Sequence, residues 1–171
     1  MTGQPLLMIF SIFRDLSSAI AAAAHVEDVI RYHGAGVDGA AVLAKDPAGK
    51  IVYHEVGKPS MPQDAARGAV LGAVVGMIFP PSLFASAFLS ASISTLVDRV
   101  EDAQLGDPGL RKLGARLAAG QAAFVVVGTE AAVNQIADAH LGYESLARRR
   151  LSPRLVAAVS EPTVTSPRDS E

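Results

Sequence analysis

The chain has 171 residues, enough for one domain with its own core and a small appendage. Half of the residues are hydrophobic, but only 5% are aromatic, so small apolar side chains must supply most of the core. The net charge of −2 argues against a general nucleic-acid-binding protein, which needs a concentrated basic face. The absence of Cys excludes disulfides, thiolate chemistry and cysteine-based metal sites.

The first third of the chain predicts a strand, a helix and a β-hairpin. Leu6 to Phe13 is a short continuous apolar run, as expected of a central strand that is buried on both faces. A helix follows over residues 15–31, where apolar side chains recur at helical spacing. Residues 37–45 and 50–57 are typical of strands, and the Asp-Pro-Ala-Gly turn at 46–49 joins them.

The middle of the chain carries no charge over the 30 residues from Gly68 to Val97. We expect a helix over about residues 64–79, which ends because Pro80-Pro81 cannot continue it. A second helix is expected over about residues 82–99. With one tight turn between them, the two helices are predicted to fold back on each other as an antiparallel hairpin.

Small side chains recur every four residues in both arms of this hairpin, so they share one face of each helix. Each glycine inside a helix costs roughly 0.5 to 1 kcal/mol, and close approach of two backbones would offset that cost. The predicted helix-packing interface is Gly68, Gly72, Gly76, Ser82, Ser86, Ser90 and Ser94. The larger side chains are predicted to form an apolar outer face of the hairpin: Val70, Leu71, Val74, Val75, Ile78, Phe84, Phe88 and Ile93.

This outer face needs an apolar environment, and we expect the rest of the chain to be too small to cover it. A single membrane crossing would separate strands that belong to one sheet. Each arm spans about 22 to 24 Å at 1.5 Å per residue, which is short of the ~30 Å hydrocarbon core. Two alternatives therefore stay open: a re-entrant hairpin in one leaflet, or a hairpin sheathed by sister subunits. A hairpin buried wholly within its own chain is the less favoured third alternative.

The last third of the chain predicts a short helix capped by Asp107, an apolar strand at 121–128 and a helix at 129–140. A weaker edge strand is expected at 144–151. From residue 153 the chain becomes rich in Pro, Ser and Thr, and residues 153–171 are predicted to be a disordered tail.

The predicted fold class is therefore α+β, with a ferredoxin-like antiparallel sheet covered by helices and an inserted apolar glycine-zipper helical hairpin. Residues 1–59 form the first β-α-β-β part of the domain, and residues 60–105 form the hairpin. Residues 106–152 complete the domain, and residues 153–171 form the tail.

Sequence motifs give no sign of a catalytic, cofactor or metal site. Gly34 to Gly39 matches G-x-G-x-x-G, but a helix precedes it and a strand follows, which is the reverse of a dinucleotide site. The four His residues lie at no metal-ligand spacing. An acidic cluster at 98–102 is more typical of a solvated helix end than of a metal site. Arginines at 148–150 suit an edge strand that avoids aggregation, with lipid attraction as the alternative.

The run GAVLGAVVGMIF at 68–79, followed by LGDPGLRKLGARLAAGQAAFVVV at 105–127, resembles the bacterial family called domain of unknown function 1269. Members are often described as predicted membrane proteins, and the resemblance extends over about Leu6 to Leu151. It implies a glycine-zipper hairpin followed by a short helix and an apolar strand. The family has no agreed reaction or ligand, so the resemblance implies no catalytic residue. The Pro80-Pro81 turn, the serine-rich second arm and the C-terminal tail depart from the family's pattern.

The sequence therefore predicts a non-enzymatic, self-associating bacterial protein without a cofactor. Its hairpin would pack into a homo-oligomer or dock to a membrane, in the cytoplasm or at the inner face of the cell membrane. The alternative is a small-molecule-binding or enzymatic ferredoxin-like domain that uses the cleft between sheet and hairpin. A polar cleft containing His54 or His140 would favour that alternative.

Overall fold

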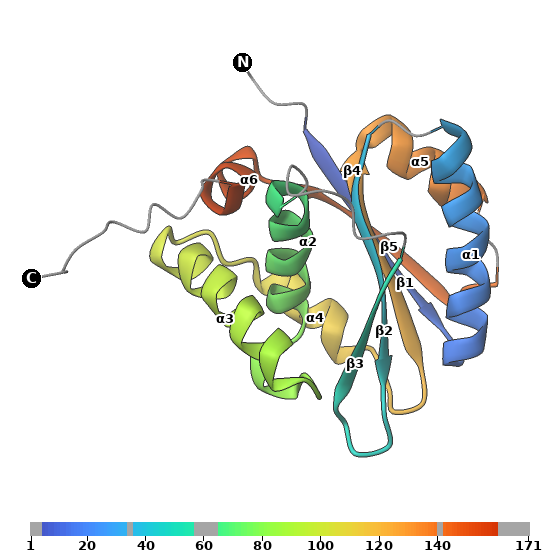
Figure 1. Cartoon of the computed structure of the whole chain (residues 1–171), viewed down its shortest axis with the longest axis horizontal. Coiled ribbons are helices and arrows are strands. Elements are labelled where there is room, and N and C mark those ends of the chain that lie inside the picture. The colour runs from blue at the N-terminus through green and yellow to red at the C-terminus, as the bar shows by residue number, and fades with distance from the viewer. Residues whose placement is uncertain (1–4, 34–35, 57–64, 140–141, 161–171) are drawn as a thin grey trace, which may run out of the picture.

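A computed structural model describes residues 5–33, 36–56, 65–139 and 142–160 (Figure 1). Within these residues, five strands form one sheet in the order β3-β2-β4-β1-β5, and all neighbouring strands are antiparallel. The strands are β1 (Leu6–Phe13), β2 (Val37–Lys45), β3 (Ile51–Glu55), β4 (Ala122–Thr129) and β5 (Ser145–Leu151). The mixed α+β class expected from the sequence is therefore confirmed.

Helices cover both faces of the sheet (Figure 1). On one face lie α1 (Leu16–His33) and α5 (Glu130–Ala139). On the other face lie α2 (Ala65–Ile78), α4 (Pro108–Ala115) and α6 (Pro153–Ser160). A short 3-10 helix η2 (Pro81–Leu83) leads from α2 to α3 (Ala87–Asp102), which packs on the outer side of α2.

The central strands β1 and β4 are buried along nearly their whole length, as their continuous apolar sequences predict. Successive side chains of β1 point to opposite faces, so the sheet supports two separate cores. Phe10 contributes to the core under α2, whereas Ile9 contributes to the core under α1 and α5. The edge position of β5 and the turn that joins β2 to β3 agree with the sequence as well.

The apolar face of α2 is covered within the same chain, contrary to the sequence argument. From residue 68 to its end this helix is apolar on all sides, a pattern typical of a helix in the interior of a protein. It packs against the sheet, α3, α4 and α6, and Leu71 lies against Gly39 of β2. The expectation that one chain is too small to hide these side chains is wrong, because the sheet and three other helices together surround α2.

The C-terminal segment also differs from the sequence prediction. Residues 153–160 form α6 instead of a disordered tail, and Leu155 and Val159 are 4% and 2% exposed. Both side chains join the core that contains α2. Pro153 suits the first position of a helix, where its missing N–H is not needed. The remainder of the predicted tail, residues 161–171, lies outside the described part of the chain.

Among the described helices, none combines the length and the apolar character that a membrane-spanning segment requires.

Candidate functional site

Glycines of α2 form one side of its contact with α3, but the side chains of α3 that face them are not the predicted serines. A Cβ at Gly72 would lie 2.8 Å from Cδ1 of Leu96, and one at Gly76 would lie 2.5 Å from Cγ2 of both Ile93 and Val97. The glycines therefore leave room for branched side chains of α3. Because position 72 faces 96 and position 76 faces 93, the two helices run in opposite directions. Gly68 belongs to α2, and nothing further is described at that position.

The four serines do not form the face that meets the glycines. Ser82 is exposed in η2, and Ser86 is exposed before α3 begins. Ser90 and Ser94 lie in α3 and are half-buried, and the Ser90 hydroxyl donates a hydrogen bond to the carbonyl oxygen of Pro81 at 2.8 Å. Because the helix starts at residue 87, the spacing of four does not continue across all four positions.

The predicted outer face is buried throughout its described side chains. Ile93 is turned toward Gly76 instead of away from it. Phe84 is 5% exposed and its backbone pairs with Ile51 in an isolated parallel bridge, and the N–H of Ala85 donates to the carbonyl of Ile51 at 2.9 Å. The turn after Pro80 thus rests on the start of β3. The buried members of the face are Val70, Leu71, Val74, Val75, Ile78, Phe84 and Ile93, and the Phe88 side chain is outside the described set.

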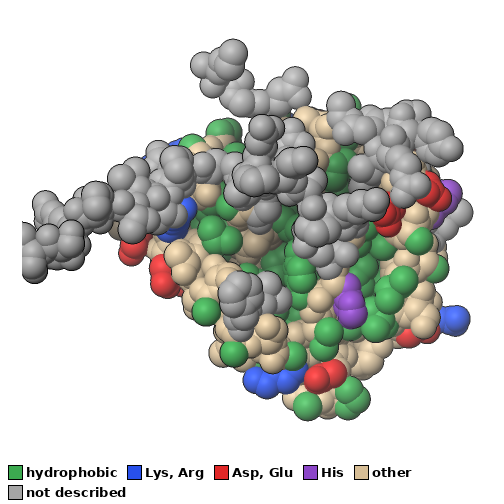
Figure 2. Space-filling view, viewed as in Figure 1, with side chains coloured by type: hydrophobic (Ala, Val, Ile, Leu, Met, Phe, Trp, Pro, Cys, Tyr) green, Lys and Arg blue, Asp and Glu red, His purple; other side chains and the backbone are tan. Residues whose placement is uncertain are grey.

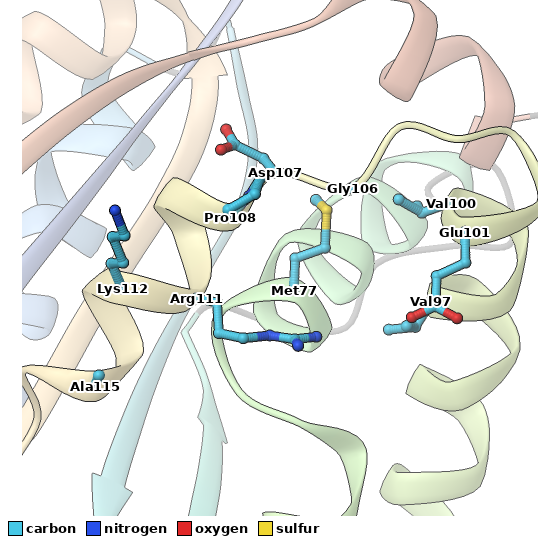
Figure 3. A pocket seen from close by; sticks show the side chains of 10 residues that line it. All are labelled: Met77, Val97, Val100, Glu101, Gly106, Asp107, Pro108, Arg111, Lys112 and Ala115. Carbon is cyan, nitrogen blue, oxygen red and sulfur yellow. The ribbon is translucent and has the colours of Figure 1, made fainter.

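A cleft of about 510 Å³ opens between α2, α3 and α4 (Figure 3). Its apolar part is formed by Met77 of α2 and by Val97 and Val100 of α3. Charged side chains line the rim, with Glu101 on α3 and Arg111 on α4. The sticks in Figure 3 show the Arg111 side chain reaching past Met77 toward the α3 wall.

The two walls of the cleft carry opposite charge. On α3, Asp98, Glu101 and Asp102 are exposed, but only Glu101 lines the cleft. Acidic side chains gather over the C-terminal end of this helix at the left of Figure 2. On α4, Arg111 and Lys112 are exposed and line the cleft. We call these side chains the acidic row and the basic row. Among the described residues, neither Glu101 nor Arg111 has an ion-pair partner within 4.0 Å.

The arginines of β5 are paired within the chain, in contrast to Arg111. Arg149 forms an ion pair with Asp107 at 2.9 Å, and Arg150 forms one with Glu130 at 3.2 Å. The Arg148 guanidinium donates to the side-chain oxygen of Asn134 at 2.9 Å. The arginine run therefore joins an edge strand to the helices beside it. This role was missed by the sequence analysis, which considered only aggregation and lipids.

The position of α4 is fixed at both of its ends. Asp107 is the N-cap, as predicted, and its carboxylate accepts a hydrogen bond from the N–H of Gly109 at 2.8 Å while pairing with Arg149. Toward the other end, a Cβ at Gly114 would collide with the carbonyl oxygen of Ile78. Glycine there lets α4 approach the end of α2 closely. The resulting placement sets the width of the cleft.

The histidines are not brought together. His25 lies on α1 in a shallow groove of about 650 Å³ on the opposite side of the sheet, together with Arg14 and Ser18. His54 is exposed on β3, and His140 lies outside the described residues. Across the described ranges, no three His, Asp or Glu side chains are arranged to hold a metal ion.

The cleft was not predicted from the sequence, although one signal for it is present. Pro108, Arg111, Lys112 and Ala115 line it at the spacing of one helical face. A helix face with two charged side chains is usually interpreted as a solvent-exposed surface. The sequence does not show that α4 lies beside the end of α2, because that depends on the close approach at Gly114.

These observations define an α+β domain whose sheet is covered by helices on both faces, with a charged cleft beside the α2–α3 pair. The chain belongs to the family described as Protein of unknown function (DUF1269), whose sequence profile matches residues 65–161. The match starts at α2 and includes α6, so it is shifted from the range of about 6–151 expected from the resemblance. Comparisons with curated proteins and with solved structures gave no match.

Proposed function

We propose that the protein is a non-enzymatic, self-associating protein that forms a homo-oligomer through the α3–α4 face. The observation that carries this proposal is the cleft itself, which is lined by Glu101 from α3 and by Arg111 and Lys112 from α4, with apolar side chains between them. A surface that binds a copy of itself must be self-complementary, and a patch with both signs of charge meets that requirement.

The proposed interface lies on α3 and α4 and not on the apolar face of α2 that the sequence suggests. The side chains of α2 are used inside the chain, so they are no longer a reason for assembly. The outer side of the pair is α3, and its Val97 is half-buried and lines the cleft, although one of its methyl groups faces Gly76. Val97, Pro108 and Ala115 supply the apolar surface of the proposed contact, because Met77 and Val100 are only 6% and 1% exposed.

We also propose that the fold is ferredoxin-like. The strand order β3-β2-β4-β1-β5 supports this, because β4 separates β1 from β2 and β1 separates β4 from β5. The helices α1 and α5 are the two crossovers, and β3 is an additional edge strand. The positions of Gly72 and Gly76 against α3 support a glycine-based helical hairpin inserted into this framework.

Membrane docking at the inner face of a bacterial cell membrane remains the second form of the hypothesis. It would use the same outer side of α3. The acidic row disfavours it, because the cytoplasmic leaflet is negatively charged and would repel Asp98, Glu101 and Asp102. We therefore propose a cytoplasmic location over one at the inner face of the cell membrane. Flotation with vesicles that contain anionic lipid is the measurement that would reverse this assignment.

Small-molecule binding is a second candidate function, favoured by the volume of the cleft. About 510 Å³ lies within the range of roughly 300 to 1,000 Å³ that is typical of ligand pockets. The predicted cleft between sheet and hairpin does not support this alternative, because Val74 and Ile78 fill that space with buried apolar side chains. The remaining support comes from the cleft between α3 and α4.

An exposed alanine in the cleft provides the test. Ala115 lines the cleft on α4, whereas Ala131 is exposed on α5, on the opposite face of the sheet. We expect Ala115→Glu to reduce the oligomer mass in sedimentation velocity, because it puts a carboxylate into the basic row. The control Ala131→Glu makes the same chemical change and should leave the mass as in the unsubstituted chain. Equal masses for all three proteins, each folded by circular dichroism, would contradict the proposed interface.

A further inference from the structure

We propose that the self-association is a two-fold dimer in which Glu101 of each copy pairs with Arg111 of the other. This inference rests on the proposed function and specifies its geometry. The two side chains lie on opposite walls of one cleft, on α3 and α4. In a two-fold contact every pair of partners occurs twice. If Glu101 of the first copy meets Arg111 of the second, then Glu101 of the second copy also meets Arg111 of the first.

Glu101 and Arg111 form no ion pair with each other within the described part of the chain, whereas Asp107, which also lines the cleft, is paired with Arg149. In Figure 3 the Arg111 side chain reaches across the cleft toward the wall that carries Glu101, yet no ion pair within 4.0 Å joins the two among the described residues. Arg149 on β5 differs from Arg111, because it forms an ion pair with Asp107 of the same chain. Glu101 and Arg111 thus remain accessible to an incoming surface of opposite sign.

A second copy fits this face better than a single-signed partner would. A basic peptide would be attracted by the acidic row but repelled by Arg111 and Lys112 at the other wall. An acidic ligand would be attracted by Arg111 and Lys112 but repelled by the acidic row. A two-fold arrangement sets the acidic row of α3 against the basic row of α4 on both sides. The apolar side chains of Val97, Pro108 and Ala115 then lie near the centre of the contact.

Mixing two charge-reversed chains tests this pairing. Glu101→Arg alone puts two cations opposite each other at both contacts, and Arg111→Glu alone puts two anions there. Each variant alone should dimerise more weakly, by roughly tenfold or more in dissociation constant. Mixed in equal amounts, they should form a heterodimer, because both contacts then join Arg to Glu. The double variant Glu101→Arg with Arg111→Glu should dimerise like the unsubstituted chain.

The outcomes separate the inference from the proposal on which it rests. An unsubstituted chain that stays a monomer overturns the self-association itself. Unsubstituted dimers whose dissociation constant is unchanged by either reversal overturn only the Glu101–Arg111 pairing. A mixture that remains as weakly associated as its components also overturns the pairing, because an effect within one chain cannot be rescued by another. Native mass spectrometry of the mixture distinguishes heterodimers if one variant carries a short mass tag.

Discussion

At the scale of single residues, the contact between α2 and α3 depends on one glycine more than on the other. Leu96, opposite Gly72, touches with the far end of a flexible side chain. Opposite Gly76 stand the γ2 methyl groups of Ile93 and Val97, which are β-branched and keep one rotamer in a helix. A small shift of the Leu96 side chain can therefore accommodate an added methyl group at position 72, whereas the rigid neighbours of position 76 cannot move aside in the same way.

This difference predicts opposite effects of the same substitution. Gly72→Ala should leave the free energy of unfolding unchanged or raise it by up to about 1 kcal/mol, because alanine is the better helix former. Gly76→Ala should lower it by about 1 to 3 kcal/mol, because the added methyl group overpacks the contact with Ile93 and Val97. Urea denaturation of both variants measures the difference. A Gly76→Ala chain as stable as Gly72→Ala would show that α3 does not lie where the structure has it.

At the scale of elements, α6 completes the core around α2, although its sequence predicts a disordered tail. Leu155 and Val159 are four residues apart and lie on the face of α6 that is buried. Full burial of one such side chain contributes about 1.5 to 3 kcal/mol. The helix is therefore a structural part of the domain, and it lies inside the segment matched by the family.

A comparison of two shortened chains tests the role of α6. A chain that ends at Ser152 should unfold at a markedly lower temperature than one that ends at Ser160, because it lacks the buried Leu155 and Val159. The expected loss is about 3 to 6 kcal/mol from these two side chains alone. Thermal unfolding followed by circular dichroism measures it. Coinciding unfolding curves would mean that α6 does not cover the core.

The central strands could be predicted from the sequence because a strand that is buried on both faces is a continuous run of apolar residues. Leu6 to Phe13 is apolar throughout, and β1 has these same bounds. The surroundings of α2 could not be predicted in this way. Its composition indicates an apolar environment, but lipid, a sister subunit and the chain's own sheet all provide one. Only the tertiary positions of α4 and α6 decide between them.

The cleft illustrates a second limit of sequence patterns. Glu101 and Arg111 are ten positions apart on different helices, and each by itself is an ordinary surface charge. Their juxtaposition depends on the approach of α4 to α2 at Gly114. The tail was misjudged for a different reason, because its Pro, Ser and Thr content obscured the apolar residues at 155, 156 and 159.

At the scale of the whole molecule, the sheet joins the segment matched by the family to the part of the chain before it. The matched residues 65–161 contain only the strands β4 and β5. These two strands are not neighbours, because β1 lies between them and pairs with both. The strands β1, β2 and β3 are thus required for the core that holds α2 and for the placement of the proposed interface.

Self-association through the α3–α4 face is the central claim, and the mass of the unsubstituted chain in detergent-free buffer tests it most directly. Sedimentation equilibrium over a range of protein concentrations should give a mass that rises with concentration toward twice the 17.7 kDa of one chain. A mass that stays at 17.7 kDa at every concentration would contradict the claim.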